Sequence, residues 1–174
     1  MTQYNKLLCK VLMIFVLVVI GCGIFKPQQT TGTTDADFNL IFKYGVGARN
    51  ELNTFEETFT KDMVIDPPIT VAFSLTKKES DEIYQKMTEI NFFDYPDTFS
   101  VFMDSEEIGF FSPYPTYYFK VEYNLNIKEL LWRDNMMTED EKAMRLREFI
   151  NFIRNIIESK EEYKELPPAQ GGYL

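Results

Sequence analysis

Hydrophobic and polar residues alternate in several short stretches of this 174-residue chain. The clearest stretch is 38–44, where every second residue from Phe38 to Tyr44 is aromatic or leucine. An alternation with a period of two is typical of a strand that buries one face. The same pattern, weaker in the first case, predicts further strands over 51–64, 69–75, 116–123 and 127–134.

Two other stretches carry hydrophobic residues at spacings of three and four, which indicates helices with one buried side. The first follows Thr76-Lys77-Lys78-Glu79, a capping box, and places Ile83, Met87 and Ile90 on one side. The second follows another capping box, Thr138-Glu139-Asp140-Glu141. Its buried side is expected to hold Ala143, Leu146, Phe149, Ile150, Ile153, Ile156 and Ile157.

The order of these elements is strands, a helix, two strands and a helix. Because no regular strand–helix–strand alternation persists, a parallel sheet is not expected. We therefore expect an α+β fold, an antiparallel sheet of about five strands with two main helices packed on one face. Pro67-Pro68 is expected to break the chain between two strands, and the stretch from Asp94 to Pro115 to be mostly loop.

The beginning of the chain has a different pattern. An uncharged apolar run of 15 residues, Val11 to Phe25, lies between Lys10 and Lys26. It is shorter than the roughly 20 apolar residues that a helix needs to cross a bilayer. It fits the apolar core of a signal peptide, about 7–15 residues behind a positively charged start. Lys6 and Lys10 supply that charge, so the pattern predicts a signal peptide.

Val19-Ile20-Gly21-Cys22, inside this run, resembles the lipobox of bacterial lipoproteins. The layout around "LTKKESDEIYQKMTEINFF" and "LLWRD" is similar to that of small lipoproteins of Gram-positive bacteria. In lipoproteins the peptide before the cysteine is cleaved, and the thiol receives a diacylglyceryl group. The resemblance therefore implies that Cys22 is the lipidation site and the first residue of the mature chain. It implies no activity and no cofactor. The alternative is an uncleaved N-terminal anchor in which Cys22 is incidental.

These features divide the chain into four parts. We expect a signal peptide over 1–21, the lipidated cysteine and a flexible tether over 22–36, one α+β domain over 37–166 and a tail over 167–174. The tether is rich in Thr, Gln and Gly and would reach about 20 Å. Both interpretations of the start place the domain at the extracytoplasmic face of the cell membrane.

Composition excludes several classes of function. The formal net charge is −9, and loss of Lys6 and Lys10 with the signal peptide would change it to −11. Nucleic-acid binding requires a basic patch, so it is not expected. The chain has no histidine, and its two cysteines are Cys9, in the signal peptide, and Cys22. Zinc sites of the His/Cys kind and Ser-His-Asp or Cys-His catalysis are therefore excluded.

Two short motifs are compatible with chemistry, each with a plainer explanation. Ser74 and Lys77 match the S-x-x-K pattern of penicillin-binding proteins, but the accompanying S-D-N and K-T-G motifs are absent. Asp104, Glu106 and Glu107 offer oxygen ligands for calcium, with an acidic surface loop as the alternative.

Aromatic residues are dense between Phe92 and Phe119. Aromatic side chains on a loop can stack against sugars or anchor a partner protein, and burial over the sheet is the alternative. Exposed rings are expected where no strand pattern accounts for them. The candidate partner-binding residues are Phe99, Phe102, Phe110, Phe111 and Tyr114.

Together these observations predict a membrane-anchored extracytoplasmic lipoprotein whose domain binds an envelope protein or a glycan and is not an enzyme. One alternative is a hydrolase of cell-wall glycan, because two carboxylates can perform that reaction without histidine. The other is an inhibitor or immunity-type protein whose acidic surface meets a basic partner.

Overall fold

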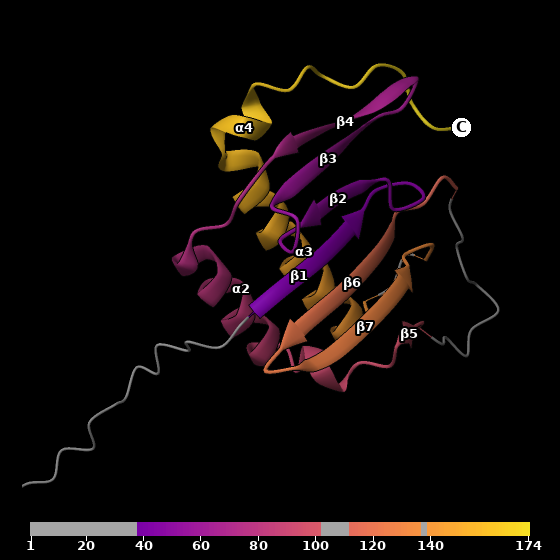
Figure 1. The fold of residues 1–174 in the computed structure, drawn as a ribbon. Coiled ribbons are helices and arrows are strands. Elements are labelled where there is room, and N and C mark those ends of the chain that lie inside the picture. Colours follow the sequence, from indigo (N-terminus) through magenta and orange to yellow (C-terminus); the bar gives the residue numbers. More distant parts are fainter. Residues whose placement is uncertain (1–37, 102–111, 137–138) are drawn as a thin grey trace, which may run out of the picture. The chain divides into compact units, whose positions relative to one another are not determined.

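The computed structural model describes residues 38–101, 112–136 and 139–174, all within one compact unit, Thr34–Leu174. The described residues have the predicted α+β class, with helices on one face of a mostly antiparallel sheet (Figure 1). In this part of the chain the sheet has seven strands, rather than about five.

The elements follow one another with short connections. The strands are β1 (Phe38–Tyr44), β2 (Asn50–Asn53), β3 (Thr58–Met63), β4 (Asp66–Ala72), β5 (Thr98–Phe99), β6 (Thr116–Tyr123) and β7 (Asn126–Arg133). The helices are α2 (Lys77–Glu89), α3 (Glu141–Ser159) and α4 (Glu161–Lys164), with a 3-10 turn η1 (Phe92–Asp94). The strand order is β4-β3-β2-β1-β6-β7-β5, and only β5 pairs in parallel, with β7.

The predicted strand over 51–64 is wrong, because a turn divides it into β2 and β3. The side chain of Asn53 supports this turn by accepting hydrogen bonds from the backbone N–H groups of Phe55 and Glu56, at 3.1 and 3.3 Å. Asn side chains stabilise turns in this way. Glu57 completes the turn in the left-handed region, with φ of 52°.

Pro67 and Pro68 do not break the chain as predicted; they lie inside β4. Proline is tolerated there because β4 is an edge strand and need not donate hydrogen bonds on both sides. The predicted alternation that follows is confirmed. Phe73 is buried, and Val71 and Leu75 pack against the core.

The expected loop between Asp94 and Pro115 contains a short strand. Thr98 and Phe99 form β5, and the backbone N–H of Leu131 in β7 donates to the carbonyl of Asp97 at 2.7 Å. Two residues are too few to produce a recognisable alternation, so sequence reasoning could not have identified this strand.

Both predicted helices form, and the residues expected on their buried sides are buried, except Ile90 and Ile156, which are partly buried. The capping box of α2 is complete, since Thr76 accepts from the Glu79 backbone and Glu79 accepts from the Thr76 backbone. The expected cap of the second helix, Thr138, lies outside the described residues. The observed N-cap of α3 is Asp140, whose carboxylate accepts from the Ala143 N–H at 2.8 Å, so the helix begins later than predicted.

The core lies between the sheet and the helices and is rich in aromatic residues. Phe119 of β6 stacks on Phe42 of β1 at 4.8 Å between ring centroids, and Phe92 meets Phe119 edge-on at 5.2 Å. Phe149 of α3 contacts both Phe92 and Phe119 at 5.9 Å. Much of the aromatic density between Phe92 and Phe119 therefore serves burial.

The hairpin that joins β6 to β7 has an unusual turn. Asn124 and Leu125 both have positive φ, 49° and 63°, which defines a two-residue turn of the kind normally formed by Asn-Gly. Leucine in the left-handed region is strained by about 1–2 kcal/mol. The hairpin lies at the end of the sheet where β1 begins, because Phe38 pairs with Tyr123 (Figure 1).

No helix in the described ranges is both long and apolar enough to span a bilayer.

Glu79 connects the start of α2 to the end of α3, which leads to a prediction about acid stability. Burial alone would raise the pKa of Glu79, but Lys160 at 2.7 Å and the backbone of Thr76 lower it from its usual 4.5. A lowered pKa contributes stability that is present above the usual value and is lost as the pH falls through the folded-state value.

We therefore expect Glu79→Gln, which retains the capping geometry, to lower the free energy of unfolding at pH 7 by about 1 kcal/mol or less. The variant should also lose less stability than the native protein when the pH is lowered. Urea unfolding at pH 7 and at acid pH measures both effects. Parallel acid profiles for the two proteins would show that this carboxylate is not involved.

Candidate functional site

The two faces of the sheet differ in what covers them. In the view of Figure 1, α3 runs behind the sheet. Helices α2 and α4 contact the same face, because Tyr84 meets Phe38 and Tyr163 meets Phe59. No described element covers the opposite face, which we call the open face. The strand register places Lys43, Tyr118, Leu131 and Thr98 in one row across it, from β1 to β5.

The neighbouring rows of the open face mix charge with apolar surface. Ile41, Lys120 and Glu129 form the second row. Glu122 and Ile127 pair in the third, and Ile127 is 60% exposed. A sheet face that packs against nothing usually alternates to polar residues. The apolar residues on this face are therefore available for contact with another molecule.

A hollow of about 510 Å³ lies at the β5–β7–β6 side of the open face. Its lining residues come from the three strands and the segment before β5. They are Asp97, Thr98, Tyr118, Ile127, Glu129 and Leu131. The hollow thus combines two carboxylates, two hydroxyl groups and aliphatic walls.

Tyr118 and Glu129 are diagonal neighbours on the open face, because Tyr118 pairs with Leu131 and Glu129 pairs with Lys120. Burial raises the pKa of Tyr118, and the negative charge of Glu129 raises it further. Tyr118 therefore stays protonated near neutral pH, so its hydroxyl can donate a hydrogen bond. The carboxylate of Glu129 can accept from a ligand, such as a cation or a hydroxyl group.

Lys128 determines the position of the second carboxylate. Its ammonium group donates to Asp97 at 2.6 Å and to the carbonyl of Tyr95 at 2.7 Å. These bonds tie the segment before β5 to β7. The Asp97 side chain is nevertheless 82% exposed, whereas that of Lys128 is largely covered. The acid therefore faces solvent, and the base that partly neutralises it does not.

A second cavity, of about 300 Å³, lies between the end of α2 and the start of α3. It contains two acids, Asp94 and Glu141, and two bases, Lys142 and Arg145. Arg145 forms an ion pair with Glu141, and the tyrosine at the cavity wall, Tyr95, donates to the Lys142 carbonyl. The cavity has no excess charge to select a ligand, so it is the weaker candidate.

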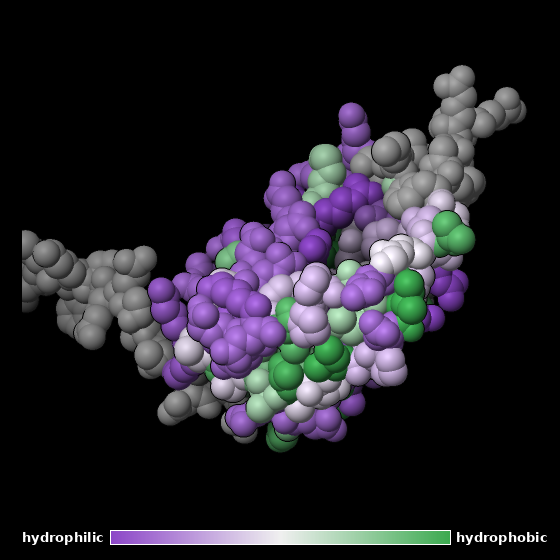
Figure 2. Space-filling model, turned by 90° about the horizontal axis from the view of Figure 1, so that it is seen from above, coloured by the Kyte–Doolittle hydropathy of each residue, from purple (hydrophilic) through white to green (hydrophobic). Residues whose placement is uncertain are grey.

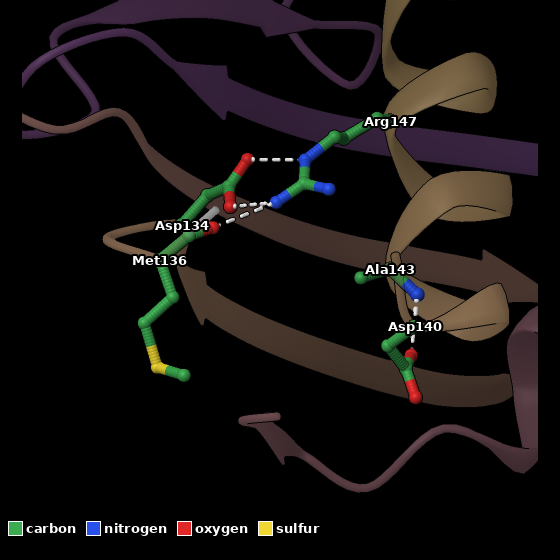
Figure 3. Close-up of polar contacts among 5 residues, drawn as sticks. All are labelled: Asp134, Met136, Asp140, Ala143 and Arg147. Carbon is green, nitrogen blue, oxygen red and sulfur yellow. Dashed lines mark hydrogen bonds and ion pairs between the residues drawn. The ribbon is translucent and has the colours of Figure 1, made fainter. Parts of the chain in front are cut away.

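Asp134, just after β7, is the one charged residue that is buried among the described residues, and it pairs with Arg147 of α3. Figure 3 shows their side chains facing each other. Arg147 donates to both carboxylate oxygens, at 2.8 and 2.6 Å, and to the carbonyl of Met136 at 3.1 Å. Its guanidinium also lies over the Trp132 ring, 5.3 Å from the centroid. The pair holds the end of β7 against α3, which makes it a structural clamp.

The C-terminal tail also docks on the domain. The Tyr173 hydroxyl donates to Asp62 and accepts from Arg49 at 3.3 Å. Gln170 forms a parallel bridge with Val64, at the end of β3. Burial, and then the charge of Asp62, raises the pKa of Tyr173. The polar residues near this end of the sheet thus bind the chain's own terminus.

The structure describes only two of the five predicted partner-binding residues. Phe99 is only 7% exposed and packs against Tyr95 and Trp132, so the expectation of an exposed ring at this position is wrong. The register of β5 explains this, because it pairs Phe99 with the buried Trp132. Tyr114 is half-buried. Phe102, Phe110 and Phe111 lie outside the described residues.

The remaining sequence candidates are the lipidation site, the possible calcium ligands and the S-x-x-K motif. Cys22 and the acidic residues Asp104, Glu106 and Glu107 lie outside the described residues. Within the described ranges, no group of three or more acidic or cysteine side chains could hold a metal ion. In the S-x-x-K motif, Lys77 forms an ion pair with Asp81, one turn along α2.

Sequence reasoning missed the residues that line the hollow, although a signal for them existed. The alternation over 116–123 places Tyr117, Phe119 and Val121 on one side of the strand, and therefore places Tyr118 on the other. Glu129 likewise points outward from the next predicted strand. An outward-facing aromatic residue beside an outward-facing acid was therefore deducible.

Figure 2 looks down on the side formed by α4 and β4. Most of this surface is hydrophilic, with a limited group of hydrophobic residues near the middle. The chain has no significant match to a known protein family, a curated protein or a solved structure. The candidate site on the open face is therefore supported by the geometry of its residues alone.

Proposed function

We propose that residues 38–174 form a non-enzymatic binding domain, held at the outer face of a bacterial membrane by lipid on Cys22. The partner is a basic segment of an envelope protein, which binds on the open face. The observation that carries this proposal is the hollow, where Tyr118, Glu129 and Asp97 meet apolar walls on an uncovered sheet face.

Charge favours a basic partner. The chain carries a net charge of −9, and the hollow presents Glu129 and the exposed Asp97. Complementary charge accelerates encounter and selects among partners. Lys128 is largely covered and already bonded to Asp97. Lys120 lies opposite Glu129 on the same face, with its ammonium over the Phe55 ring, 5.9 Å from the centroid. A lysine or arginine of the partner would therefore meet Asp97 freely and Glu129 beside this one cation.

Shape favours long side chains. Lys and Arg carry aliphatic stems that pack along apolar surface while their charged ends stay with acids. Leu131 and Ile127 offer such surface, and the Tyr118 ring can receive a cation on its face. An inhibitor or immunity-type protein would use the same contact, with an enzyme as the basic partner.

Hydrolysis of glycan is the weaker candidate, although two carboxylates share the hollow. That reaction needs one carboxylic acid kept protonated, which enzymes achieve by burying it in apolar surroundings. Asp97 is 82% exposed and ion-paired, and Glu129 lies on an uncovered sheet face opposite Lys120. Neither environment suits a general acid, so binding is the function that the geometry supports best.

A titration with a short peptide of alternating lysine and leucine, followed by NMR, tests this function. We expect shifts at the open-face residues of β5, β6 and β7, and weaker binding at higher salt. Glu129→Gln should raise the dissociation constant about two- to fivefold. Glu162→Gln, which removes an exposed acid of α4, is the matched control and should change little.

Shifts spread evenly over the acidic surface, or equal effects of the two variants, would contradict the proposal. The same titration with cell-wall muropeptides separates the glycan alternative. If muropeptides shift the residues of the hollow and the basic peptide does not, the domain binds glycan.

A further inference from the structure

Exposed apolar residues gather at the end of the sheet where β1 begins. Leu125, at the tip of the β6–β7 hairpin, is 91% exposed, and Ile127 follows it on β7. Phe93 of η1 is also exposed. The Phe93 ring lies 6.1 Å from the ring of Tyr84, which stacks on Tyr123 of β6 at 4.2 Å. These contacts place Phe93 at the same end of the sheet.

Leu125 does not serve the fold in this position. Its positive φ suits glycine, and its side chain projects into solvent instead of packing on the core. A bulky apolar residue is therefore kept in a strained backbone conformation, and its exposed side chain makes no packing contact with the core that would offset the cost in free energy. Strain at an exposed position is an indication of a functional contact.

The hairpin is anchored at its base and carries no charge at its tip. Asn124 and Asn126 flank Leu125, and Tyr123 is held between the β1 pairing and the ring of Tyr84. An uncharged apolar tip on an anchored base can enter the interfacial layer of a bilayer without desolvating an ion.

The connection to the lipid site enters the domain at the same place. Phe38, the first residue of β1, pairs with Tyr123 at the base of the hairpin. Only 15 residues, 23–37, separate Phe38 from Cys22, and a chain of this length reaches about 20 Å. Any lipid on Cys22 therefore keeps this end of the domain close to the bilayer.

We propose that the β6–β7 hairpin is a membrane-contacting element, with Leu125 in the lipid interface and Ile127 and Phe93 beside it. This proposal rests on the lipid anchor of the proposed function. Contact through so few side chains is weak in free solution, but a tether makes it intramolecular and raises its effective concentration. Because the contact is apolar, it does not require the basic patch that this acidic domain lacks.

Depth-dependent quenching tests the contact. The full chain, purified from its host membrane, is reconstituted in phosphatidylcholine vesicles with a doxyl-labelled lipid. Leu125→Cys carries an NBD fluorophore, which we expect the lipid to quench by at least about twofold. Ile65→Cys is the matched control, because Ile65 is apolar, 73% exposed and located in the β3–β4 turn at the other end of the sheet. Its label should not be quenched.

Equal quenching at the two positions, or none at Leu125 in protein that floats with the vesicles, would overturn the proposal. If the chain does not float because Cys22 is unmodified, the anchor of the proposed function fails instead. Residues 23–174, which contain the whole core and no cysteine, can then be bound to nickel-chelating lipid through an added hexahistidine segment. That arrangement keeps the tether length and decides the role of the hairpin separately.

Leu125→Gly provides a test without a label. Glycine fits the turn better, so the variant should unfold at a higher urea concentration than the native protein. On vesicles, hydrogen exchange at 123–127 should slow in the native protein but not in the variant. Equal slowing in both would contradict insertion of the leucine. A more stable variant that loses lipid contact cannot be explained by misfolding.

Discussion

Cys22→Ala is expected to abolish palmitate labelling of the protein and to release it from the membrane or leave it as an unprocessed precursor. The thiol of Cys22 is the proposed attachment point for two acyl chains, and each buried CH₂ group contributes about 0.8 kcal/mol to membrane binding. Loss of one sulfur atom therefore removes the whole anchor. Metabolic labelling and cell fractionation measure the result.

Cys9→Ala is the matched control for this experiment. Cys9 lies in the segment predicted to be removed, so its replacement should leave labelling and location unchanged. Labelling that persists in Cys22→Ala, or that is lost only in Cys9→Ala, would show that the lipobox interpretation is wrong.

Arg147→Ala should destabilise the domain by about 3–5 kcal/mol, because it leaves the buried carboxylate of Asp134 without its partner. The substitution also removes the hydrogen bond to Met136 and the packing over Trp132. Urea unfolding monitored by the fluorescence of Trp132, the chain's only tryptophan, measures the loss.

Arg145→Ala is the control for this prediction. Arg145 lies on the same helix and pairs with Glu141, but both side chains are exposed, so we expect a change within about 0.5 kcal/mol. The double variant Asp134→Ala/Arg147→Ala should recover part of the stability lost in Arg147→Ala, since no buried charge remains unpaired. Similar small losses for the two arginine variants would show that the clamp is not important for stability.

The elements that could be predicted from the sequence are those whose residues repeat with a clear period. The alternation from Phe38 to Tyr44 and the helical stripe from Leu146 to Ile157 record burial directly, because one face of each element meets the core. The capping box at Thr76 also predicted the start of α2, since its two hydrogen bonds are local.

The errors arose where a tertiary contact or a single side chain decides the structure. Asn53 divides a predicted strand through two hydrogen bonds to the following backbone, which leave the hydrophobic pattern unchanged. Pro67 and Pro68 are accepted because β4 has no second neighbour, a property of the strand order. Phe99 is buried because two residues pair with β7.

The hollow shows the same limit. The outward positions of Tyr118 and Glu129 follow from alternation, but their proximity depends on the pairing of β6 with β7. Asp97 joins them only because Lys128 and the Leu131 backbone hold its segment against β7. The proximity of these three residues can therefore be recognised only in the three-dimensional fold.

Site-specific photocrosslinking in the native host tests most directly whether the open face binds a partner. A benzoylphenylalanine replaces Tyr118 in the hollow, and the control places it at Met144, an exposed residue of α3 on the opposite side of the sheet. We expect one dominant protein adduct from position 118, containing a basic segment at the linkage, and no such adduct from position 144. The same adducts from both positions, or adducts from position 144 alone, would contradict it.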